Sequence, residues 1–594
     1  MNDDANESRW GSDVVADFLR ETGVPFIALN PGASFRGLHD SLVNHLGAQG
    51  PEILMCLHEE HAVALAHGYA KVTGTPMAVA LHSNVGLMHA SMAIYNAWAD
   101  RVPVFIIGAN GPVDSARRRP WIDWIHSSGD QASIVRNYIK WDDQPASLPA
   151  TVDSLIRAWD IVRTPPMAPT YVVLDTTVQE ARLEQPVALP KPTSEPVVTP
   201  PEAPAGIVAD VVARLQSAAS PVFLLGRLSR SPEDWAHRVS LAEQVGARVI
   251  TDLKAGASFP TTHPAHVPGP AFFLSTHGQR VLAEADVVVA FDWIDLGGTL
   301  AQAPAVGARY VVNVSQDAQL HNGWSKDHFS RIPADVTLPI NPDIGVAQLV
   351  AASSAGAPLP SGSGGYRSKA SGGASSVLER TAAEADGGPA SDAITLPLLA
   401  QTLREVLHDV DTTLVRLPLG WDGAAWPFEH PLDYLGYDGG GGIGSGPGML
   451  VGAALALRGT GRIAVGVLGD GDYLMGVQAL WTAAHNAIPL LAIVSNNRSY
   501  FNDEVHQQKV AETRGRDASR KWIGQRIDDP APDLAGLARA QGLEGIGPIS
   551  AVHDLANALR TAVDLFRSGR PVVVDVVVET GYSPSMAAGL VREG

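Results

Sequence analysis

The sequence predicts an α/β protein made of three doubly wound domains, each a parallel sheet covered by helices. Short apolar runs alternate along the chain with segments whose apolar residues follow the helical period, a pattern typical of such sheets. The 594 residues, 45% of them hydrophobic, can bury several separate cores. Two stretches of unusual composition divide the chain into three blocks of ordinary domain size.

We expect these two stretches to connect the domains. Residues 184–205 contain seven prolines, which oppose helices and sheets and predict a semi-rigid connector. Among residues 352–376, nineteen of the twenty-five are Gly, Ser or Ala, which predicts a flexible tether. The expected parts are an N-terminal domain at 1–184, a central domain at 205–351, a linker at 352–392 and a C-terminal domain at 393–594.

Strands and helices are expected to alternate in each block. The first block predicts strands at 52–57, 77–81 and 102–107, and helices at 60–72 and 87–98. The second predicts strands at 221–225, 248–251 and 285–291, and a helix that ends at Val245. The third predicts strands at 462–468 and 488–495 on either side of a helix at 474–486.

Charge and composition exclude several classes of protein. The net charge of −19 opposes binding to nucleic acids or anionic membranes, because both need a basic face. The single cysteine, Cys56, cannot form an internal disulfide, and residues 1–4 lack the features of a signal peptide. No apolar stretch is as long as a membrane span. We therefore expect a cytoplasmic protein.

Oxygen ligands follow two neighbouring strands of the third block. Asp470 comes directly after the strand at 462–468, and Asn497 follows the next strand. The carboxyl ends of parallel strands meet at one edge, so these side chains can converge. Carboxylate and amide oxygens suit Mg²⁺ when phosphates complete its shell. The alternative for Asp470 is an ordinary helix N-cap, but the second strand end favours a site for a metal and a diphosphate.

This segment resembles the diphosphate and metal motif of the thiamine diphosphate (ThDP) dependent enzymes. The motif reads LGDG at 468–471, ALWTAA at 479–484, IP at 488–489 and NN at 496–497, and is similar to the benzoylformate decarboxylase and acetolactate synthase branch. The resemblance implies that Asp470, Asn497 and the carbonyl of Ser499 bind the metal. It also places Gly469, Gly471 and Asp472 at the cofactor. Arg498 departs from the small residue that is usual in the family.

A glycine run at 439–444 permits two interpretations. It satisfies the GxGxxG pattern of dinucleotide-binding loops, but the expected acidic residue about 20 positions later is missing, which disfavours an NAD enzyme. In ThDP enzymes the similar segment bends the cofactor. The resemblance then implies that Gly442 contacts the cofactor and that Ile443 lies between its two rings. Without the neighbouring motif, Ile443 would be an ordinary core residue.

Two glutamates in the first block are candidates for activating the cofactor. The base of ThDP is its own aminopyrimidine, which needs a carboxyl group at the opposite ring nitrogen. The family glutamate stands nine residues before a Gly-Tyr-Ala, here at 68–70, which selects Glu59 and leaves Glu60 as the rival. Both could instead complement the helix dipole. The spacing of His58 and His61 disfavours a zinc site.

His82 is the first candidate on the substrate side. The segment from Val79 to Ser83, with Gly86, resembles benzoylformate decarboxylase, which implies that His82 moves a proton. The alternative is a histidine that bonds backbone groups at a strand end. The family's substrate-binding serine is replaced by Ala33, one residue before Ser34.

Asp503 and Glu504 are further candidates, because an acid at this distance from the metal motif touches the substrate in pyruvate decarboxylases. A carboxylate there could stabilise charge or donate a proton, and the alternative is an acidic first helical turn followed by His506. Residues 293–296 lack the second active-site histidine of benzoylformate decarboxylase, which disfavours a close copy of that enzyme. We also expect no FAD in the central domain. Arg227 and Arg230, after Gly226, could meet a diphosphate, but we expect them to be solvated surface residues.

The resemblance implies a ThDP- and Mg²⁺-dependent lyase that acts on the carbon–carbon bond beside a carbonyl. The favoured reaction is decarboxylation of a 2-oxo acid through a C2 carbanion and an enamine. An acetolactate synthase-like carboligase, a 2-hydroxy carbonyl lyase and a silent ThDP-binding homologue remain alternatives. The family forms its active sites at a subunit interface, so a homodimer or homotetramer is implied.

Overall fold

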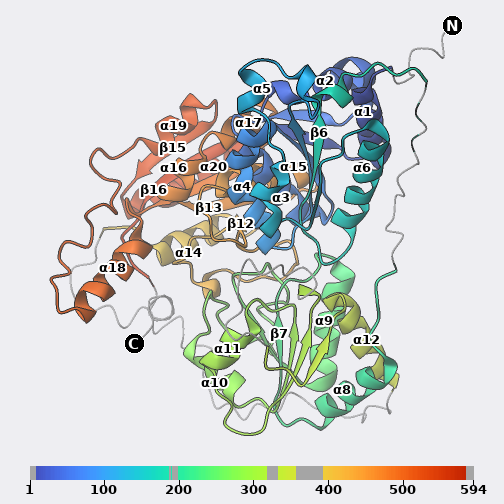
Figure 1. Ribbon diagram of the computed structural model, residues 1–594. Helices are drawn as coiled ribbons and strands as arrows, with labels where there is room; N and C mark the ends of the chain where they lie inside the picture. The colour runs from blue at the N-terminus through green and yellow to red at the C-terminus, as the bar shows by residue number, and fades with distance from the viewer. Residues whose placement is uncertain are drawn as a thin grey trace.

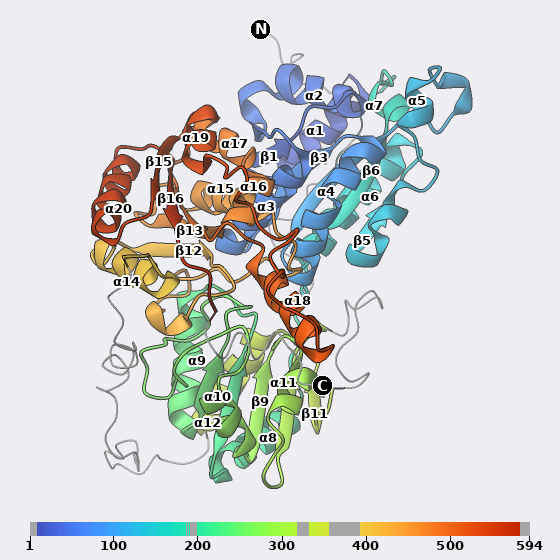
Figure 2. The ribbon, with the colours of Figure 1, turned by 90° about the vertical axis from the view of Figure 1, so that its left-hand side faces the viewer.

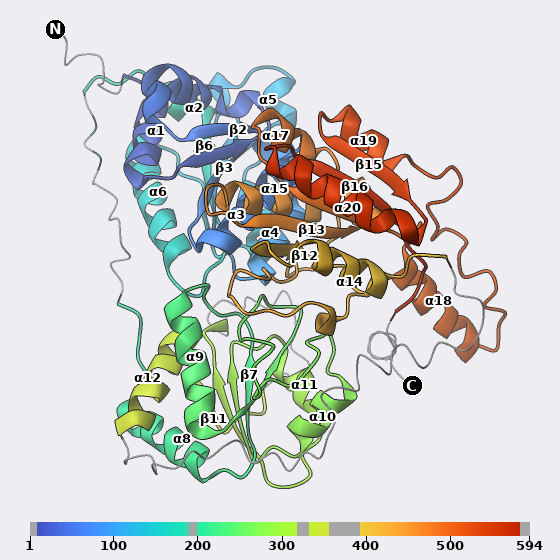
Figure 3. The same cartoon turned by 180° about the vertical axis from the view of Figure 1, so that it is seen from behind.

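The computed structural model describes residues 9–185, 187, 189, 199–317, 332–355 and 392–582. Three parallel sheets with helices on their faces form three domains, which confirms the predicted fold class. The N-terminal and C-terminal domains lie side by side, and the central domain lies below both of them in Figure 1. Figure 3 shows the same arrangement from behind. Among the described residues, no helix has the length and apolar character needed to cross a membrane.

The N-terminal sheet has the strand order β2-β1-β3-β4-β6-β5. Its strands are β1 (Phe26–Leu29), β2 (Glu52–Met55), β3 (Met77–Leu81), β4 (Val104–Asn110), β5 (Trp141–Asp143) and β6 (Thr170–Asp175). The helices are α1 (Gly11–Thr22), α2 (Arg36–Asp40), α3 (Glu59–Thr73), α4 (Ser83–Ala99), α5 (Ile122–Ile125), α6 (Leu148–Arg163) and α7 (Thr176–Gln179). The buried strands β3 and β4 are continuous apolar runs because helices cover both faces of the sheet.

The central sheet has the order β11-β10-β9-β7-β8. Its strands are β7 (Pro221–Leu225), β8 (Arg248–Thr251), β9 (Val287–Phe291), β10 (Tyr310–Val314) and β11 (Val336–Leu338). The helices are α8 (Ala205–Ser217), α9 (Pro232–Val245), α10 (Thr276–Ala283), α11 (Leu296–Gln302) and α12 (Pro342–Ala355). The tether that we expect at 352–392 lies mostly outside the described residues, and α12 includes its first four positions.

The C-terminal sheet has the order β12-β13-β14-β16-β15. Its strands are β12 (Thr412–Arg416), β13 (Ile463–Gly469), β14 (Leu491–Asn496), β15 (Glu544–Ile549) and β16 (Val572–Val577). The helices are α14 (Leu396–Val406), α15 (Gly446–Ala456), α16 (Asp470–Gly476), α17 (Ala479–His485), α18 (Phe501–Thr513), α19 (Leu534–Ala540) and α20 (Val552–Arg567). The single helix predicted at 474–486 is wrong, because the chain breaks into α16 and α17 after Gly476.

Helices α3 and α15 join the N-terminal and C-terminal domains. A Cβ atom at Gly68 would lie 2.0 Å from the carbonyl oxygen of Met449, and one at Gly452 would lie 1.8 Å from that of Leu65. The two backbones therefore approach as closely as glycine permits, and one continuous core spans both domains. Figure 2 shows α3 and α15 between the two sheets. This packing fixes the loops of one domain relative to the other.

Candidate active site

The predicted metal residues meet at the carboxyl ends of β13 and β14. The two strands pair in parallel with Gly469 opposite Ser495, so Asp470 and Asn497 leave the sheet at the same edge. The backbone N–H of Ser499 lies 3.2 Å from Oδ2 of Asp470 and 3.0 Å from Oδ1 of Asn497. The convergence that the strand pattern predicts is therefore present.

The chemistry of this edge fits a magnesium ion and a diphosphate. Burial raises the pKa of Asp470 to about 6, although its carboxylate accepts hydrogen bonds from nearby backbone N–H groups. A buried carboxylate of this kind gains from a cation beside it. No atom lies within 4 Å of the place where a Cβ atom of Gly469 would be, so this edge has open space for a diphosphate. The side-chain oxygens of Asp470 and Asn497, with the carbonyl of Ser499, supply the hard donors that Mg²⁺ prefers.

The glycine loop before α15 is fixed by two buried carboxylates. Asp438 accepts the N–H of Gly441 at 2.8 Å. Asp472 accepts the N–H groups of Gly444 and Gly446 at 2.6 and 3.2 Å. Gly441 and Gly444 have positive φ angles of 74° and 105°, which side chains rarely tolerate. Ile443 is half-buried in this loop and does not belong to the described core clusters.

Arg416, at the end of β12, lies between these two carboxylates. Its Nη1 is 2.8 Å from Asp438, and its Nε is 3.3 Å from Asp472. All three side chains are buried, and the Arg416 guanidinium offsets part of the negative charge of the two carboxylates. Asp472, which the motif places at the cofactor, thus contacts the loop backbone in this structure. Sequence reasoning missed Arg416 and Asp438, because their pairing joins a strand end to a distant loop.

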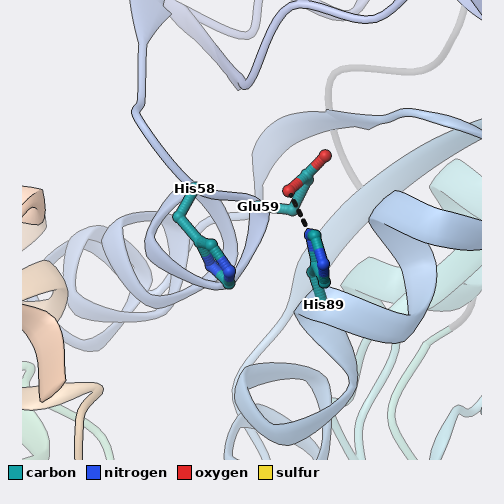
Figure 4. A group of neighbouring side chains, drawn as sticks. All are labelled: His58, Glu59 and His89. Carbon is teal, nitrogen blue, oxygen red and sulfur yellow. Dashed lines mark hydrogen bonds and ion pairs between the residues drawn. The ribbon is translucent and has the colours of Figure 1, made fainter.

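Glu59 opens α3 and is almost wholly buried, with 6% of its surface exposed. The preceding His58 caps the helix, because its Nδ1 accepts the backbone N–H of Glu60 at 3.2 Å. Figure 4 shows the Glu59 carboxylate directed at His89 of α4, with Oε2 3.0 Å from the ring Nδ1. Its other oxygen, Oε1, faces Gly86, where an added Cβ would lie 3.0 Å away.

Glu60 points to a different side of α3. It faces the chain's own C-terminal domain, where a Cβ at Gly444 would lie 3.9 Å from its Oε1. Burial raises the pKa of Glu60, and the nearby Asp472 raises it further. Consecutive residues of an α-helix are about 100° apart around its axis, so Glu59 and Glu60 face different surroundings. The described contacts of Glu59 come from the N-terminal domain alone.

His58, Glu59 and His89 together contain ligand types that zinc accepts, but their geometry opposes a metal site. Nδ1 of His58 accepts a backbone N–H, so a neutral ring carries its proton on Nε2 and has no lone pair left for a metal. The rings of His58 and His89 are stacked, with centroids 4.8 Å apart and planes 21° apart. The ligand atoms of the three residues lie within 4.8 Å of one another, but Nδ1 of His89 is engaged with the Glu59 carboxylate.

His82 precedes α4 and contacts the serine that follows Ala33. The backbone N–H of Ser34 donates to Nδ1 of His82 at 3.4 Å, and the Ser34 hydroxyl, which accepts the N–H of Ser83 at 3.1 Å, lies 2.9 Å from the same Nδ1. A neutral His82 therefore carries its proton on Nε2. Burial, followed by the neighbouring His126, lowers the pKa of His82, which favours this neutral form at neutral pH.

The two acids of α18 have different environments. Glu504 is 1% exposed, and its Oε1 accepts the hydroxyl of Ser499 at 2.6 Å. It also lies 3.4 Å from Arg526. Glu504 therefore supports the loop that carries the predicted metal ligands. Asp503 is exposed at the first turn of the same helix.

The expectation of solvated arginines after β7 is wrong. Arg227 is mostly buried and pairs with Asp292 at 2.9 Å and with Asp317 at 3.1 Å. Arg230 donates to backbone carbonyls of both the central and C-terminal domains, including those of Ala257 and Leu435. Arg227 also donates to the carbonyl of Ala99 in the N-terminal domain at 3.1 Å, so both arginines join domains. The local sequence after Gly226 does not indicate this role.

Two further contacts at the site escaped prediction. Asn96 of α4 donates to the carbonyl of Gly442 at 3.2 Å and to the Ser445 hydroxyl at 2.9 Å, so it ties the glycine loop to the N-terminal domain. His89 holds Glu59, as described above. A signal for His89 was present: it follows His82 by seven residues and Gly86 by three, which places all three on one helical face.

Comparison with known families identifies the class of protein. Three family models match the chain: the N-terminal TPP binding domain of thiamine pyrophosphate enzymes at residues 9–134, the central domain at 208–321 and the C-terminal TPP binding domain at 420–576. Thiamine pyrophosphate is another name for ThDP. The protein belongs to the ThDP-dependent enzymes.

Individual relatives cover almost the whole chain at low identity. Benzoylformate decarboxylase from Pseudomonas aeruginosa is 24% identical and the alignment covers 95% of this chain and 98% of the relative. Acetolactate synthase from Bacillus subtilis is 22% identical, with coverages of 97% and 95%. The structure of a ThDP-dependent 4-hydroxybenzoylformate decarboxylase from Rhodococcus jostii superimposes with a TM-score of 0.76 at 21% identity, with coverages of 97% and 100%. This last likeness confirms the fold.

Proposed function

We propose that the protein is a ThDP- and Mg²⁺-dependent 2-oxo acid decarboxylase. The observation that carries this proposal is the convergence of Asp470, Asn497 and Ser499 where β13 and β14 end. A second requirement, a buried carboxylate in the N-terminal domain, is met by Glu59. These residues also oppose a silent homologue, because a chain that only bound the cofactor would not need an activating acid.

Each side chain has a task that its surroundings suit. When bound, ThDP supplies a nucleophilic carbon that attacks the substrate carbonyl. Asp470, Asn497 and Ser499 would hold the metal beside the diphosphate, and Ile443 would contact the cofactor. Glu59 would provide the carboxyl group that hydrogen-bonds the pyrimidine nitrogen. His82 can deliver the proton of its Nε2 to the product, while Asp503 and Glu504 are candidates for the substrate side.

A cavity beside the glycine loop favours a substrate with an apolar side chain. The cavity has a volume of about 360 Å³ and lies between the central domain and residues 439–441. Its lining includes the aromatic side chains of Phe272, Phe273, Trp293 and Tyr437. Burial of apolar substrate groups there would stabilise the complex, since aromatic walls exclude water.

A carboligase is the second candidate function. The acetolactate synthases among the relatives align over nearly the same length as the decarboxylase. The two reactions share the first steps and differ in whether a proton or a second carbonyl compound reaches the reacting carbon. The proton on Nε2 of His82 favours protonation at this carbon, and therefore release of the simple aldehyde rather than carboligation.

We also propose that two chains are needed for one active site. Glu60 faces the chain's own glycine loop, and Glu59 faces another direction on the same helix. A second copy that presents its metal edge to Glu59 would complete the centre. A homodimer, or a homotetramer built from two such dimers, meets this need.

The test is release of CO₂ from a panel of aliphatic and aromatic 2-oxo acids, with the products identified by mass spectrometry. ThDP and Mg²⁺ are supplied, and Glu59→Gln is compared with Glu60→Gln. We expect CO₂ and the simple aldehyde from wild type, a loss of at least about 100-fold in Glu59→Gln, and much less loss in Glu60→Gln.

Other outcomes would redirect the proposal. CO₂ with a hydroxy ketone or an acetohydroxy acid would establish the carboligase. If Glu60→Gln were the inactive variant, the activating acid would be Glu60. If no 2-oxo acid released CO₂, decarboxylation would be rejected, and cleavage of 2-hydroxy carbonyl compounds would be tested next.

A further inference from the structure

His89 holds the carboxylate of Glu59 in one orientation. Its Nδ1 lies 3.0 Å from Oε2 of Glu59, and the two residues come from different helices, α4 and α3 (Figure 4). The His89 side chain is 56% exposed, whereas that of Glu59 is 8% exposed. An imidazole at the surface therefore reaches inward to a buried acid.

The donor in this bond follows from the chemistry of the two groups. In its ionised form the Glu59 carboxylate only accepts hydrogen bonds, so in that form Nδ1 of His89 carries the proton of this bond. The Glu59 carboxylate is bonded to His89, whereas Nδ1 of His58 accepts the backbone N–H of Glu60. Its ring stacks on that of His89 and restrains the plane in which His89 lies.

We propose that His89 is a positioning residue that selects which oxygen of Glu59 meets the cofactor, an inference that rests on the proposed function. By binding Oε2, His89 leaves Oε1 for the pyrimidine nitrogen. Gly86 contributes by presenting no side chain to Oε1. Without the donor from α4, the carboxylate could rotate, and a smaller fraction of molecules would have the productive orientation.

Three substitutions at one position test this geometry. In His89→Asn the amide nitrogen takes the place of Nδ1, whereas in His89→Gln it takes the place of Nε2, and His89→Leu has no donor. The first readout is the rate of deuterium exchange at the reactive carbon of bound ThDP. The second is the circular dichroism of the bound cofactor, which distinguishes its amino and imino tautomers.

We expect exchange to slow by about 10- to 100-fold in His89→Leu and His89→Gln, the range of a hydrogen bond to a charged group. His89→Asn should remain within about 3-fold of wild type and keep the imino signal. A merely structural role would affect Asn and Gln alike. Exchange at the wild-type rate in His89→Leu, or equal rates in His89→Asn and His89→Gln, would overturn the inference while leaving the proposed function intact.

A measurement without cofactor distinguishes failure of the His89 inference from failure of the proposed function. Thermal unfolding of ThDP-free Glu59→Leu, His89→Leu and the double variant forms a double-mutant cycle. We expect the double variant to lose less in Tm than the sum of the single losses, because either substitution already removes the bond. Additive losses would show that the pair is not formed and would reject the inference. If wild type bound no ThDP, the proposed function and the inference would both fail, even with a coupled pair.

Discussion

Arg498 has a left-handed backbone conformation, with a φ angle of 56°, between the two predicted metal ligands Asn497 and Ser499. This conformation costs an L-residue roughly 1–2 kcal/mol, because Cβ crowds the carbonyl oxygen. The sequence already shows Arg498 to be unusual at this position in the motif. The structure gives the physical consequence, which is strain in the loop that holds the metal site.

Glycine at position 498 should relieve this strain. We expect Arg498→Gly to be more stable than Arg498→Ala by about 1 kcal/mol, because both lack the guanidinium and only alanine keeps Cβ. The measurement is the free energy of unfolding in urea, with ThDP and Mg²⁺ absent. Equal stability of the two variants would mean that the loop relaxes and stores no strain.

Helices α3 and α15 pack against each other across two domains, with glycines at the points of closest approach. The predicted pattern placed Gly68 in a helix and in the Gly-Tyr-Ala motif, but nothing local showed that a carbonyl of another domain lies against it. We expect Gly68→Ala to destabilise the protein by about 1–3 kcal/mol, because its Cβ would lie 2.0 Å from the Met449 oxygen.

The matched control is Gly206→Ala in α8, where no atom lies within 4 Å of the added Cβ. That substitution should be neutral or slightly stabilising, because alanine favours helices over glycine. Thermal unfolding of both variants checks the pair. If Gly68→Ala were as stable as Gly206→Ala, the close approach of the two helices would be incorrect.

His266, which forms a β-bridge with Val249 of β8, should make the stability of the central domain depend on pH. Burial, with Arg248 and His263 nearby, lowers the pKa of His266 from 6.5 to about 4, and its Nε2 lies 2.8 Å from the Thr251 hydroxyl. Between these two pH values the unfolded chain binds a proton that the folded chain does not. The contribution of His266 to stability is therefore complete above pH 6.5 and is lost as the pH falls towards 4.

At pH 5 this loss amounts to about 2 kcal/mol for a single group. We expect His266→Gln, which cannot take up a proton, to lose correspondingly less stability than wild type between pH 7 and pH 5. Urea unfolding at the two pH values gives the comparison. An identical pH dependence in both proteins would contradict a neutral buried His266.

For the molecule as a whole, the strands and helices could be predicted from the sequence better than the contacts between them. The strand ends at Asp470 and Asn497 were predictable, because the two strands are neighbours along the chain and their period is clear. Contacts between distant segments, such as Asn96 with Gly442 or Arg416 with Asp472, depend on packing that no local pattern encodes. The break between α16 and α17 was missed because apolar residues continue across it.

The need for two chains in one site leads to a final prediction. Glu59→Gln and Asp470→Asn should each be inactive, since one removes the activating acid and the other a metal ligand. If the site combines Glu59 of one chain with Asp470 of its partner, a mixed dimer contains one intact centre and one with both defects. With random assortment of equal amounts, half of the dimers are mixed, and each has one working site of two.

We therefore expect co-expression of the two variants to recover about a quarter of wild-type activity, measured with ThDP and Mg²⁺ in excess. Different affinity tags on the two variants allow the mixed dimers to be purified, and these should reach about half of wild-type activity. Each variant expressed alone with both tags is the control. Inactive mixed dimers of confirmed composition would show that Glu59 and Asp470 of the same chain form the centre, so that the orientation of Glu59 away from its own glycine loop would need another explanation.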